Sequence, residues 1–278
     1  MQNAIEDLEE YKMKQRVVSA MVAFMIFIPI FFIGGMIFNL AIYVLSMVSL
    51  WEFLHIKSVR KELPGFITFI SYIIMTLFVL VNINSQDLIY SMDYRIIVGL
   101  FLVFSLPVVL YHDRSQYSIV DAFYLIGGIF FLGTSFSLLI TVRNIDLSLT
   151  LFLFIITIIT DTYAFLVGSW IGKTKLLESI SPNKTLEGMI GGILASMFVG
   201  TAFYHTVVDP SLSLYVLLFI TMFLSILGQF GDLFFSAVKR YYGKKDFSNI
   251  MPGHGGILDR LDSIIFVILG FMFFISII

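Results

Sequence analysis

Residues 236–262 read SAVKRYYGKKDFSNIMPGHGGILDRLD and form the most charged segment of an otherwise apolar chain. The segment lies between the last two apolar runs of the sequence and contains a PGHGG turn, whose glycines let backbone N–H groups approach an anion closely. It is either an ordinary polar loop between two membrane helices or a site that handles phosphates at the membrane surface. Two basic pairs, a glycine-flanked histidine and two aspartates three residues apart together favour the second interpretation.

The composition is that of an integral membrane protein. Of the 278 residues, 59% are hydrophobic and 13% are charged, against roughly 25% charged residues in a soluble domain. We predict an all-α polytopic membrane protein with about nine transmembrane helices, each needing ~20 mostly apolar residues. The chain has no cysteine, which excludes disulfides and thiolate metal sites. The nine apolar runs cover residues 17–37, 38–54, 66–83, 96–111, 122–141, 148–170, 186–207, 212–236 and 261–278.

The distribution of basic residues predicts the orientation. Lys and Arg favour the cytoplasmic side of a membrane protein. If the N-terminus is inside and the nine helices alternate, every Lys and Arg except Arg95 and Arg143 falls in a cytoplasmic segment. We therefore predict an N-in/C-out topology with residues 236–262 in the cytoplasm. A short chain built almost wholly of membrane segments, without targeting features, suggests the bacterial inner membrane.

The chain divides into three parts. Residues 1–16 form a cytoplasmic N-terminal segment, and residues 17–147 form scaffold helices that are poor in polar groups. Residues 148–278 form the catalytic region, with cytoplasmic loops at 171–185 and 237–260. In the scaffold, Glu52 and Asp121 lie near helix ends, where we expect them to be solvated.

The catalytic region carries two aspartates inside apolar runs. An ionised Asp at the centre of a membrane helix costs ~2.5–3.5 kcal/mol, so Asp161 and Asp232 should face protein or water. Gln229, Asp232, Ser236 and Lys239 follow helical spacing and share one face. A hydrogen bond to a neighbouring helix would satisfy each aspartate, but a bound cation satisfies both, and Asp is the kind of ligand that Mg²⁺ uses.

The loop before the seventh run offers a helix cap and a cation. Ser181 or Asn183 can cap that helix. Capping does not explain Lys184, because a cation has the wrong sign for a helix N-terminus unless an anion docks there. Two pairs of glycines four residues apart, Gly168 with Gly172 and Gly188 with Gly192, allow helices to approach closely.

The charged segment also contains a long motif of fixed positions, which three shorter motifs support. The long motif runs Ser236-x-x-Lys239-Arg240, Lys245-Asp246, then Pro252-Gly253-His254-Gly255-Gly256-x-x-Asp259-Arg260-x-Asp262. The shorter ones are Asp161-Thr162-x-Ala164-Phe165, Ser181-Pro182-x-Lys184-Thr185-x-Glu187-Gly188 and Gly231-Asp232-Leu233. Together they resemble the signature of the phosphatidate cytidylyltransferases, also called CDP-diacylglycerol synthases.

The resemblance implies a nucleotidyltransferase that joins CTP and phosphatidate, a membrane lipid, giving CDP-diacylglycerol and pyrophosphate at the cytoplasmic face. It implies no nucleic-acid partner, is compatible with a homodimer, and implies Mg²⁺, with a second cation left open. The implied metal ligands are Asp232, Asp259 and Asp262. The implied catalytic residues are Asp232, Asp259, Lys239, Arg240 and His254. The implied substrate-binding residues are Ser181, Lys184, Thr185, Lys245, Gly253, Gly255, Gly256, Arg260 and Asp161.

Two positions depart from the family pattern, and two other functions remain as alternatives. Ser169 stands where the family usually has Arg or Lys. Phe235 stands where an acid usually follows Asp232, which weakens the case for a second cation site. The first alternative is a CTP-dependent transferase for another lipid, of the CDP-archaeol synthase or polyprenol kinase type. The second is an ion-coupled transporter, which would use Asp161 and Asp232 as ion sites.

Overall fold

The computed structural model describes residues 15, 18, 19, 21–23, 25–80, 94–111, 113–253, 255–272 and 274. Of the predicted N-terminal segment, residues 1–16, only Gln15 is among them. Within the described ranges each of the nine predicted apolar runs contains a helix, beginning with Met21–Ile33. The helices that follow are α2 (Gly35–Ser58), α3 (Gly65–Leu80), α4 (Tyr94–Leu110), α5 (Ile119–Ile145), α6 (Leu147–Ile171), α7 (Leu186–Phe203), α8 (Leu214–Tyr241) and α9 (Leu258–Phe271).

Helix length and hydropathy support an all-α membrane protein. In the part of the chain that the structure describes, α2, α5, α6, α8 and the segment Leu186–Val208 are long and apolar enough to cross a membrane. That last segment is α7 continued by the π-helical turn η1 (Tyr204–Val208). The stretch Met21–Ile33, α3 and α4 are apolar but shorter, and α9 has 14 residues. The membrane-type fold is therefore confirmed, and the count of nine spans stays a prediction.

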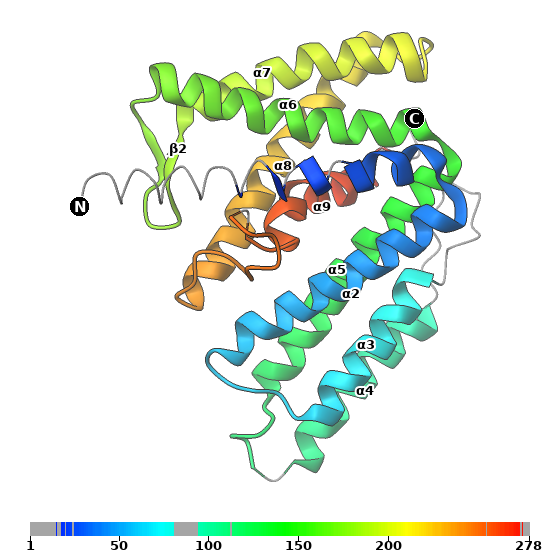
Figure 1. The fold of residues 1–278 in the computed structure, drawn as a ribbon, viewed down its shortest axis with the longest axis vertical. Coiled ribbons are helices and arrows are strands. Elements are labelled where there is room, and N and C mark those ends of the chain that lie inside the picture. The colour runs from blue at the N-terminus through cyan, green and yellow to red at the C-terminus, as the bar shows by residue number, and fades with distance from the viewer. Residues whose placement is uncertain are drawn as a thin grey trace.

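A small hairpin interrupts the helical fold between α6 and α7. Strands β1 (Lys175–Leu177) and β2 (Ser181–Thr185) pair antiparallel, with Lys175 opposite Thr185 and Leu177 opposite Ser181. The hairpin projects from the ends of α6 and α7 (Figure 1). The sequence predicted only a loop here, because three- and five-residue strands are too short to show a clear period.

The helices form two groups that α9 joins. Helices α2, α3, α4 and α5 pack together, while α6 and α7 pack against each other across one end of that group (Figure 1). Helix α9 packs against α8 and also against α5. The predicted division at residues 147 and 148 falls at the start of α6, and the functional division of the chain there stays a prediction.

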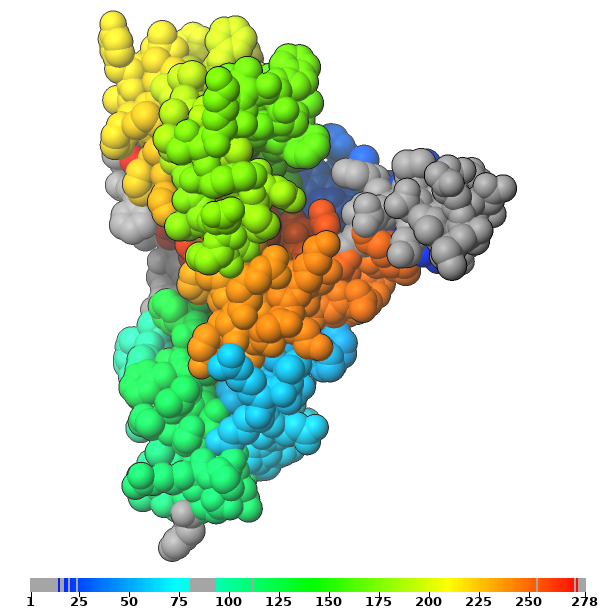
Figure 2. Space-filling model, turned by 90° about the vertical axis from the view of Figure 1, so that its left-hand side faces the viewer, coloured from blue at the N-terminus to red at the C-terminus, as the bar shows by residue number. Residues whose placement is uncertain are grey.

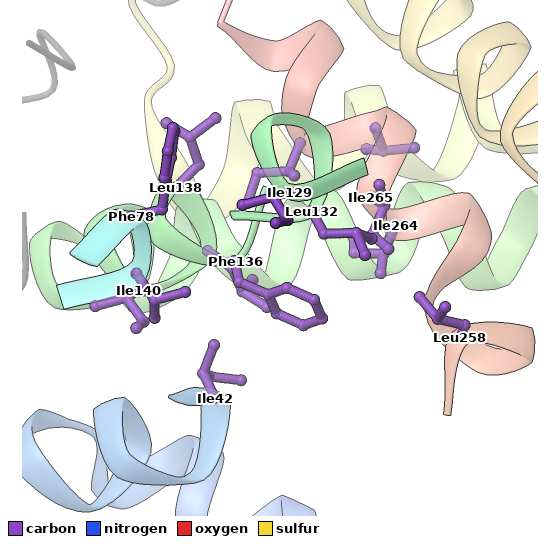
Figure 3. Packing of buried hydrophobic residues seen from close by; sticks show 14 of the residues in the cluster. Ile42, Phe78, Ile129, Leu132, Phe136, Leu138, Ile140, Leu258, Ile264 and Ile265 are labelled. Carbon is purple, nitrogen blue, oxygen red and sulfur yellow. The ribbon is translucent and has the colours of Figure 1, made fainter. Parts of the chain in front are cut away.

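A continuous apolar core connects the two groups. Residues of α2, α3, α5 and α9 point toward one another (Figure 3). Phe136 of α5 and Ile42 of α2 are almost wholly buried, as is Leu258 in the first turn of α9. Helix α9 is therefore held by the scaffold helices as well as by α8.

Close contact between α6 and α7 rests on the glycines that the sequence singled out. A Cβ atom at Gly188 would lie 2.5 Å from the Ala164 carbonyl oxygen, and one at Gly192 would lie 2.5 Å from the Thr160 carbonyl oxygen. Backbones this close leave no room for a side chain. The prediction of close helix packing from the Gly188-x-x-x-Gly192 spacing is confirmed.

Candidate active site

Asp232 on α8 is half-buried and contacts two polar side chains. Its Oδ2 atom lies 2.7 Å from Lys184 Nζ, and Ser236 Oγ donates to its Oδ1 atom over 3.3 Å. Because Lys184 belongs to β2, the hairpin supplies a cation to a carboxylate on α8. The lysine predicted to dock an anion thus lies beside a predicted metal ligand.

Two further carboxylates lie within electrostatic range of Asp232, on two other helices. Asp161 of α6 faces the hydroxyl of Ser263 on α9, and Asp262 precedes that serine in the chain. Asp262 is 8% exposed. Asp161 is exposed at the surface of the protein. The structure therefore brings Asp161, Asp232 and Asp262 together.

The chemistry of these three aspartates, which we call the aspartate cluster, suits a divalent cation. Asp oxygens are ligands that Mg²⁺ uses, and neighbouring carboxylates repel one another unless a positive charge is near. Lys184 supplies that charge at Asp232, and Lys239 lies within range of Asp262. Among the described residues no set of three or more His, Asp or Glu side chains is arranged as a ready metal cage. The residues fit Mg²⁺ by donor type and charge, and the ligand set stays a prediction.

Asp259 organises the loop between α8 and α9. Its Oδ1 atom lies 2.5 Å from Lys239 Nζ, and both side chains are buried. Its Oδ2 atom accepts hydrogen bonds from Phe247 N at 2.9 Å and from Gly256 N at 2.8 Å. Lys239 is also within electrostatic range of Asp262. It therefore links Asp259 with the aspartate cluster.

The local backbone conformation of the PGHGG turn explains why glycine stands at positions 253 and 255. Gly253 and Gly255 have φ angles of 76° and 83°, a backbone region that other residues rarely adopt. A Cβ atom at Gly255 would lie 2.9 Å from Asp259 Oδ2. His254, a predicted catalytic residue, lies outside the described residues, so its role stays a prediction.

The remaining basic residues lie in three different places. Arg240 donates from Nε to the Ile180 carbonyl at 3.3 Å and from a terminal nitrogen to the Lys244 carbonyl at 2.8 Å, and so it connects the hairpin to the end of α8. Arg260 is exposed on α9. Lys245 lines a separate cavity of about 290 Å³ together with Trp51 of α2. No member of the aspartate cluster lines this cavity.

The hairpin residues contribute differently from what the sequence suggested. Thr185 caps α7, because its side chain accepts a hydrogen bond from Gly188 N at 3.1 Å. The prediction that Ser181 or Asn183 caps this helix is wrong, since α7 begins at Leu186 and its N-cap residue is Thr185. Glu187 accepts hydrogen bonds from Lys173 N and Thr174 N, so it holds the chain where it leaves α6.

Glu52 of α2 is a residue whose role the sequence missed. We expected it to be solvated, but it is 0% exposed. Its carboxylate accepts from Ser248 Oγ, from Ile257 N at 2.9 Å and from Leu258 N at 2.7 Å. The only sequence signal was an acid within an apolar run, the same signal that singled out Asp161.

Asp121 is a second acid that the sequence wrongly expected to be solvated. It is 3% exposed and accepts from both Lys57 and Lys61. Ser118 and Asp121 also form a capping box at the start of α5. The two lysines come from the end of α2 and the segment after it, so the acid is buried by a part of the chain about sixty residues away.

The two departures from the family pattern lie in different surroundings. Phe235 is 1% exposed and packs with its ring centroid 6.0 Å from that of Phe131 and 5.8 Å from that of Phe247. A carboxylate at this position would be surrounded by aromatic rings. Ser169 is exposed, and its hydroxyl donates to the Leu166 carbonyl on its own helix.

Comparison with known proteins gives consistent matches over almost the whole chain. A family model described as "Cytidylyltransferase family" matches residues 14–278. A protein named phosphatidate cytidylyltransferase from Staphylococcus haemolyticus is 35% identical over 258 residues, which is 92% of this chain and 96% of the relative. Proteins of the same name from Staphylococcus epidermidis and Staphylococcus aureus are 36% and 35% identical over the same shares of each chain.

Proposed function

The chain belongs to the cytidylyltransferase family, and we propose from this premise that it transfers CMP from CTP to phosphatidate, giving CDP-diacylglycerol and pyrophosphate. The observation that carries the proposal is the pairing of Asp232 with Lys184, within electrostatic range of two further aspartates on α6 and α9, in a chain 35% identical to phosphatidate cytidylyltransferases over 92% of its length. These relatives favour phosphatidate over other lipid acceptors and over ion transport.

The reaction brings two anions together. An oxygen of the lipid phosphate attacks the α-phosphorus of CTP, and the bond to the pyrophosphate leaving group breaks. A phosphate monoester is already ionised, so neither a nucleophilic side chain nor a general base is required. The barrier is therefore mainly electrostatic and positional. Basic side chains lower it by reducing the repulsion between the substrates.

We assign these tasks to residues of this chain. Lys184 of the hairpin contacts Asp232 on α8, and Arg240 near the end of α8 contacts the Ile180 carbonyl in the hairpin. Both cations would neutralise the triphosphate there. Lys239 and Arg260 would hold phosphate oxygens from the α9 side. Gly253 and Gly255 adopt positive φ angles, and the leaving pyrophosphate would bind at this turn, together with His254.

We propose that Asp232 and Asp259 hold Mg²⁺, with Asp262 as a further ligand or a partner behind them. Bound there, the ion would stabilise negative charge on the reacting phosphates. Lys184 now occupies one oxygen of Asp232, and Lys239 occupies one oxygen of Asp259. Cation binding and lysine pairing therefore compete for the same carboxylates, and a lysine released from its aspartate is available to a phosphate.

We also propose nine spans, an N-in/C-out topology in a bacterial inner membrane, and an active site facing the cytoplasm. Contacts among the predicted cytoplasmic connections support this. Lys61 donates to the Arg114 carbonyl, Arg60 to the Tyr241 carbonyl, and Arg240 to that of Ile180. Figure 2 gives the same arrangement, with the end of α8 and the loop after it, in orange, between α6 and α7 above and the α2–α3 region below.

The predicted external cation Arg143 is consistent with this topology. Its guanidinium donates to the carbonyls of Phe31 and Phe32 at the end of the first helix. Both segments are predicted to lie outside, so the contact joins two external ends. A cation there also complements the negative end of a helix dipole, which gives Arg143 a structural reason to be outside.

An assay of purified protein tests the proposed function. Labelled CTP is incubated with phosphatidate and Mg²⁺, with and without a chelator, and products are separated by thin-layer chromatography. We expect CDP-diacylglycerol and pyrophosphate only when Mg²⁺ is present. Activity that survives the chelator would contradict the metal assignment alone. A product formed with a polyprenol or an archaeal ether lipid but not with phosphatidate would contradict the proposed substrate.

A further inference from the structure

Glu52, from a distant part of the chain, accepts hydrogen bonds from backbone N–H groups at the start of α9. A helix begins with N–H groups that have no partner inside the helix, and Ile257, at the N-cap of α9, provides no side-chain cap. Glu52 instead accepts from Ile257 N and Leu258 N, across 205 and 206 residues of sequence. A carboxylate at a helix N-terminus also complements the helix dipole, so α9 depends on α2 for both its hydrogen bonds and its charge.

The position of Glu52 is closely determined. A buried carboxylate is costly unless it is hydrogen-bonded, and Glu52 meets this condition with Ser248 Oγ and the two N–H groups of α9. A Cβ atom at Gly256 would lie 2.3 Å from Glu52 Oε1, so the turn makes room for the carboxylate. Five residues along α2, Lys57 is paired with the buried Asp121 of α5, which anchors this end of the helix.

The same end of α2 also holds the other end of the loop. Arg60, just after α2, donates to the Tyr241 carbonyl at the end of α8, and its guanidinium carbon lies 4.0 Å from the centre of the Tyr241 ring. A cation thus faces the C-terminus of α8 while the anion Glu52 faces the N-terminus of α9. Both charges have the sign that the helix dipoles favour, so the loop between α8 and α9 is clamped at both ends.

We propose that Glu52 is a positioning residue for the transferase reaction. It holds the first turn of α9, which carries Asp259 and, one turn on, Asp262, at the distance from Asp232 that the reaction needs. Glu52 touches neither substrate and acts through the α9 backbone. The proposal rests on the proposed roles of Asp259 and Asp262, and it assigns to the scaffold half a share in the geometry of the site.

The test compares Glu52→Gln with Ser248→Ala. The Gln variant loses the negative charge and turns one acceptor into a donor that faces a backbone N–H. The Ala variant removes one of the three hydrogen bonds and leaves Glu52 intact, so it keeps the proposal testable if the Gln variant folds poorly. We expect kcat to fall roughly 10- to 100-fold in Glu52→Gln, as for a small misplacement of reacting groups, and by less in Ser248→Ala.

Two readouts separate positioning from a loss of folded protein. The Mg²⁺ concentration for half-maximal rate should rise in Glu52→Gln, whereas a smaller folded fraction would lower the rate without moving it. Amide hydrogen exchange should also quicken in peptides covering residues 245–262 and stay unchanged in α6 and α7. The matched control is Ser49→Ala on the same helix, which is 0% exposed and whose hydroxyl has no hydrogen-bond partner among the described residues. It should change neither readout.

The outcomes distinguish this inference from the proposed function. Unchanged exchange over residues 245–262, or quickened exchange with kcat and Mg²⁺ dependence as in the parent protein, would overturn the positioning role of Glu52. Full activity in both Asp232→Asn and Asp259→Asn would instead overturn the metal ligands, and with them the proposal that Glu52 acts by placing Asp259. A parent protein inactive on CTP and phosphatidate would overturn the proposed function itself.

Discussion

Two charged clusters, around Asp121 and around Asp232, differ in how completely their carboxylates are buried and paired with cations. Asp121 is enclosed, with a side chain that is 4% exposed, and it pairs with two lysines. Asp232 has one lysine partner, a side chain that is 32% exposed, and two further carboxylates within range. A sealed and neutralised cluster suits a structural role, because a buried charge without a partner is costly. An accessible cluster with an excess of acid suits a site that gathers cations and phosphates.

The largest effect that would test this comparison is loss of activity in Asp232→Asn. The amide keeps the size of the side chain but removes the charge that would hold a cation. We expect CMP transfer to fall on the order of 10³-fold or more, as when a charged catalytic group is removed, while the protein still elutes as a folded species in detergent. Asp259→Asn should behave alike, with some added loss of loop order because its oxygens hold Phe247 N and Gly256 N.

The control for these variants is Asp209→Asn. Asp209 lies in the connection before α8, where its carboxylate accepts from Ser211 N and Ser211 Oγ. The substitution removes one acid of the same type before the start of α8, whereas Asp232 lies in the second half of that helix, so transfer should stay near the parent rate. Near-normal transfer in both Asp232→Asn and Asp259→Asn would show that neither aspartate holds the metal.

Asp121→Asn should have the converse effect, on stability alone. The substitution leaves Lys57 buried without its negative partner, and breaking a buried pair in this way costs about 3–5 kcal/mol. We expect a clear fall in the thermal unfolding temperature in detergent, with unchanged transfer per folded molecule. A fall of tenfold or more in transfer at unchanged thermal stability would mean that the sealed cluster takes part in the reaction, and the contrast between the two clusters would fail.

Lys184→Gln tests the open cluster from its cationic side. The amide can still hydrogen-bond to Asp232 but carries no charge for a phosphate. A charge-assisted hydrogen bond contributes about 1.5–3 kcal/mol, so we expect kcat/KM for CTP to fall roughly 10- to 100-fold, mainly through KM. Lys175→Gln is the matched control, because Lys175 lies in the same hairpin and donates to the Pro182 carbonyl rather than to an aspartate. Equal losses in both variants would point to hairpin folding instead.

The parts of the fold and site that followed from the sequence depend on local spacing. The apolar runs predicted the helices, and the four-residue spacing of Gly188 and Gly192 predicted the close approach of another helix, which in the structure is α6. Helical spacing also put Asp232, Ser236 and Lys239 on one face, and the structure has Ser236 bound to Asp232 and Lys239 paired with Asp259. Each of these features is decided by neighbours within one or two turns.

The parts that the sequence missed depend on distant segments. Whether an acid near a helix end is solvated depends on which segments pack against that end. The residues next to Glu52 in the sequence do not indicate that the start of α9, some 205 residues later, packs there. The burial of Asp121 likewise depends on two lysines from another helix end. The predicted cap of α7 is wrong because β2 continues to Thr185, so the helix begins only at Leu186 and Thr185 is its N-cap.

The smallest effect concerns that cap. Thr185 accepts from Gly188 N and is 7% exposed, so Thr185→Ala should lower the free energy of unfolding by about 1 kcal/mol, while Thr185→Ser, which keeps the hydroxyl, should retain most of it. Ser181→Ala should leave thermal stability unchanged, because its side chain is not the cap. If Thr185→Ala instead raised the KM for CTP with no change in thermal unfolding, the hydroxyl would belong to the substrate site, and the boundary between the structural and reactive regions would have to move into the hairpin.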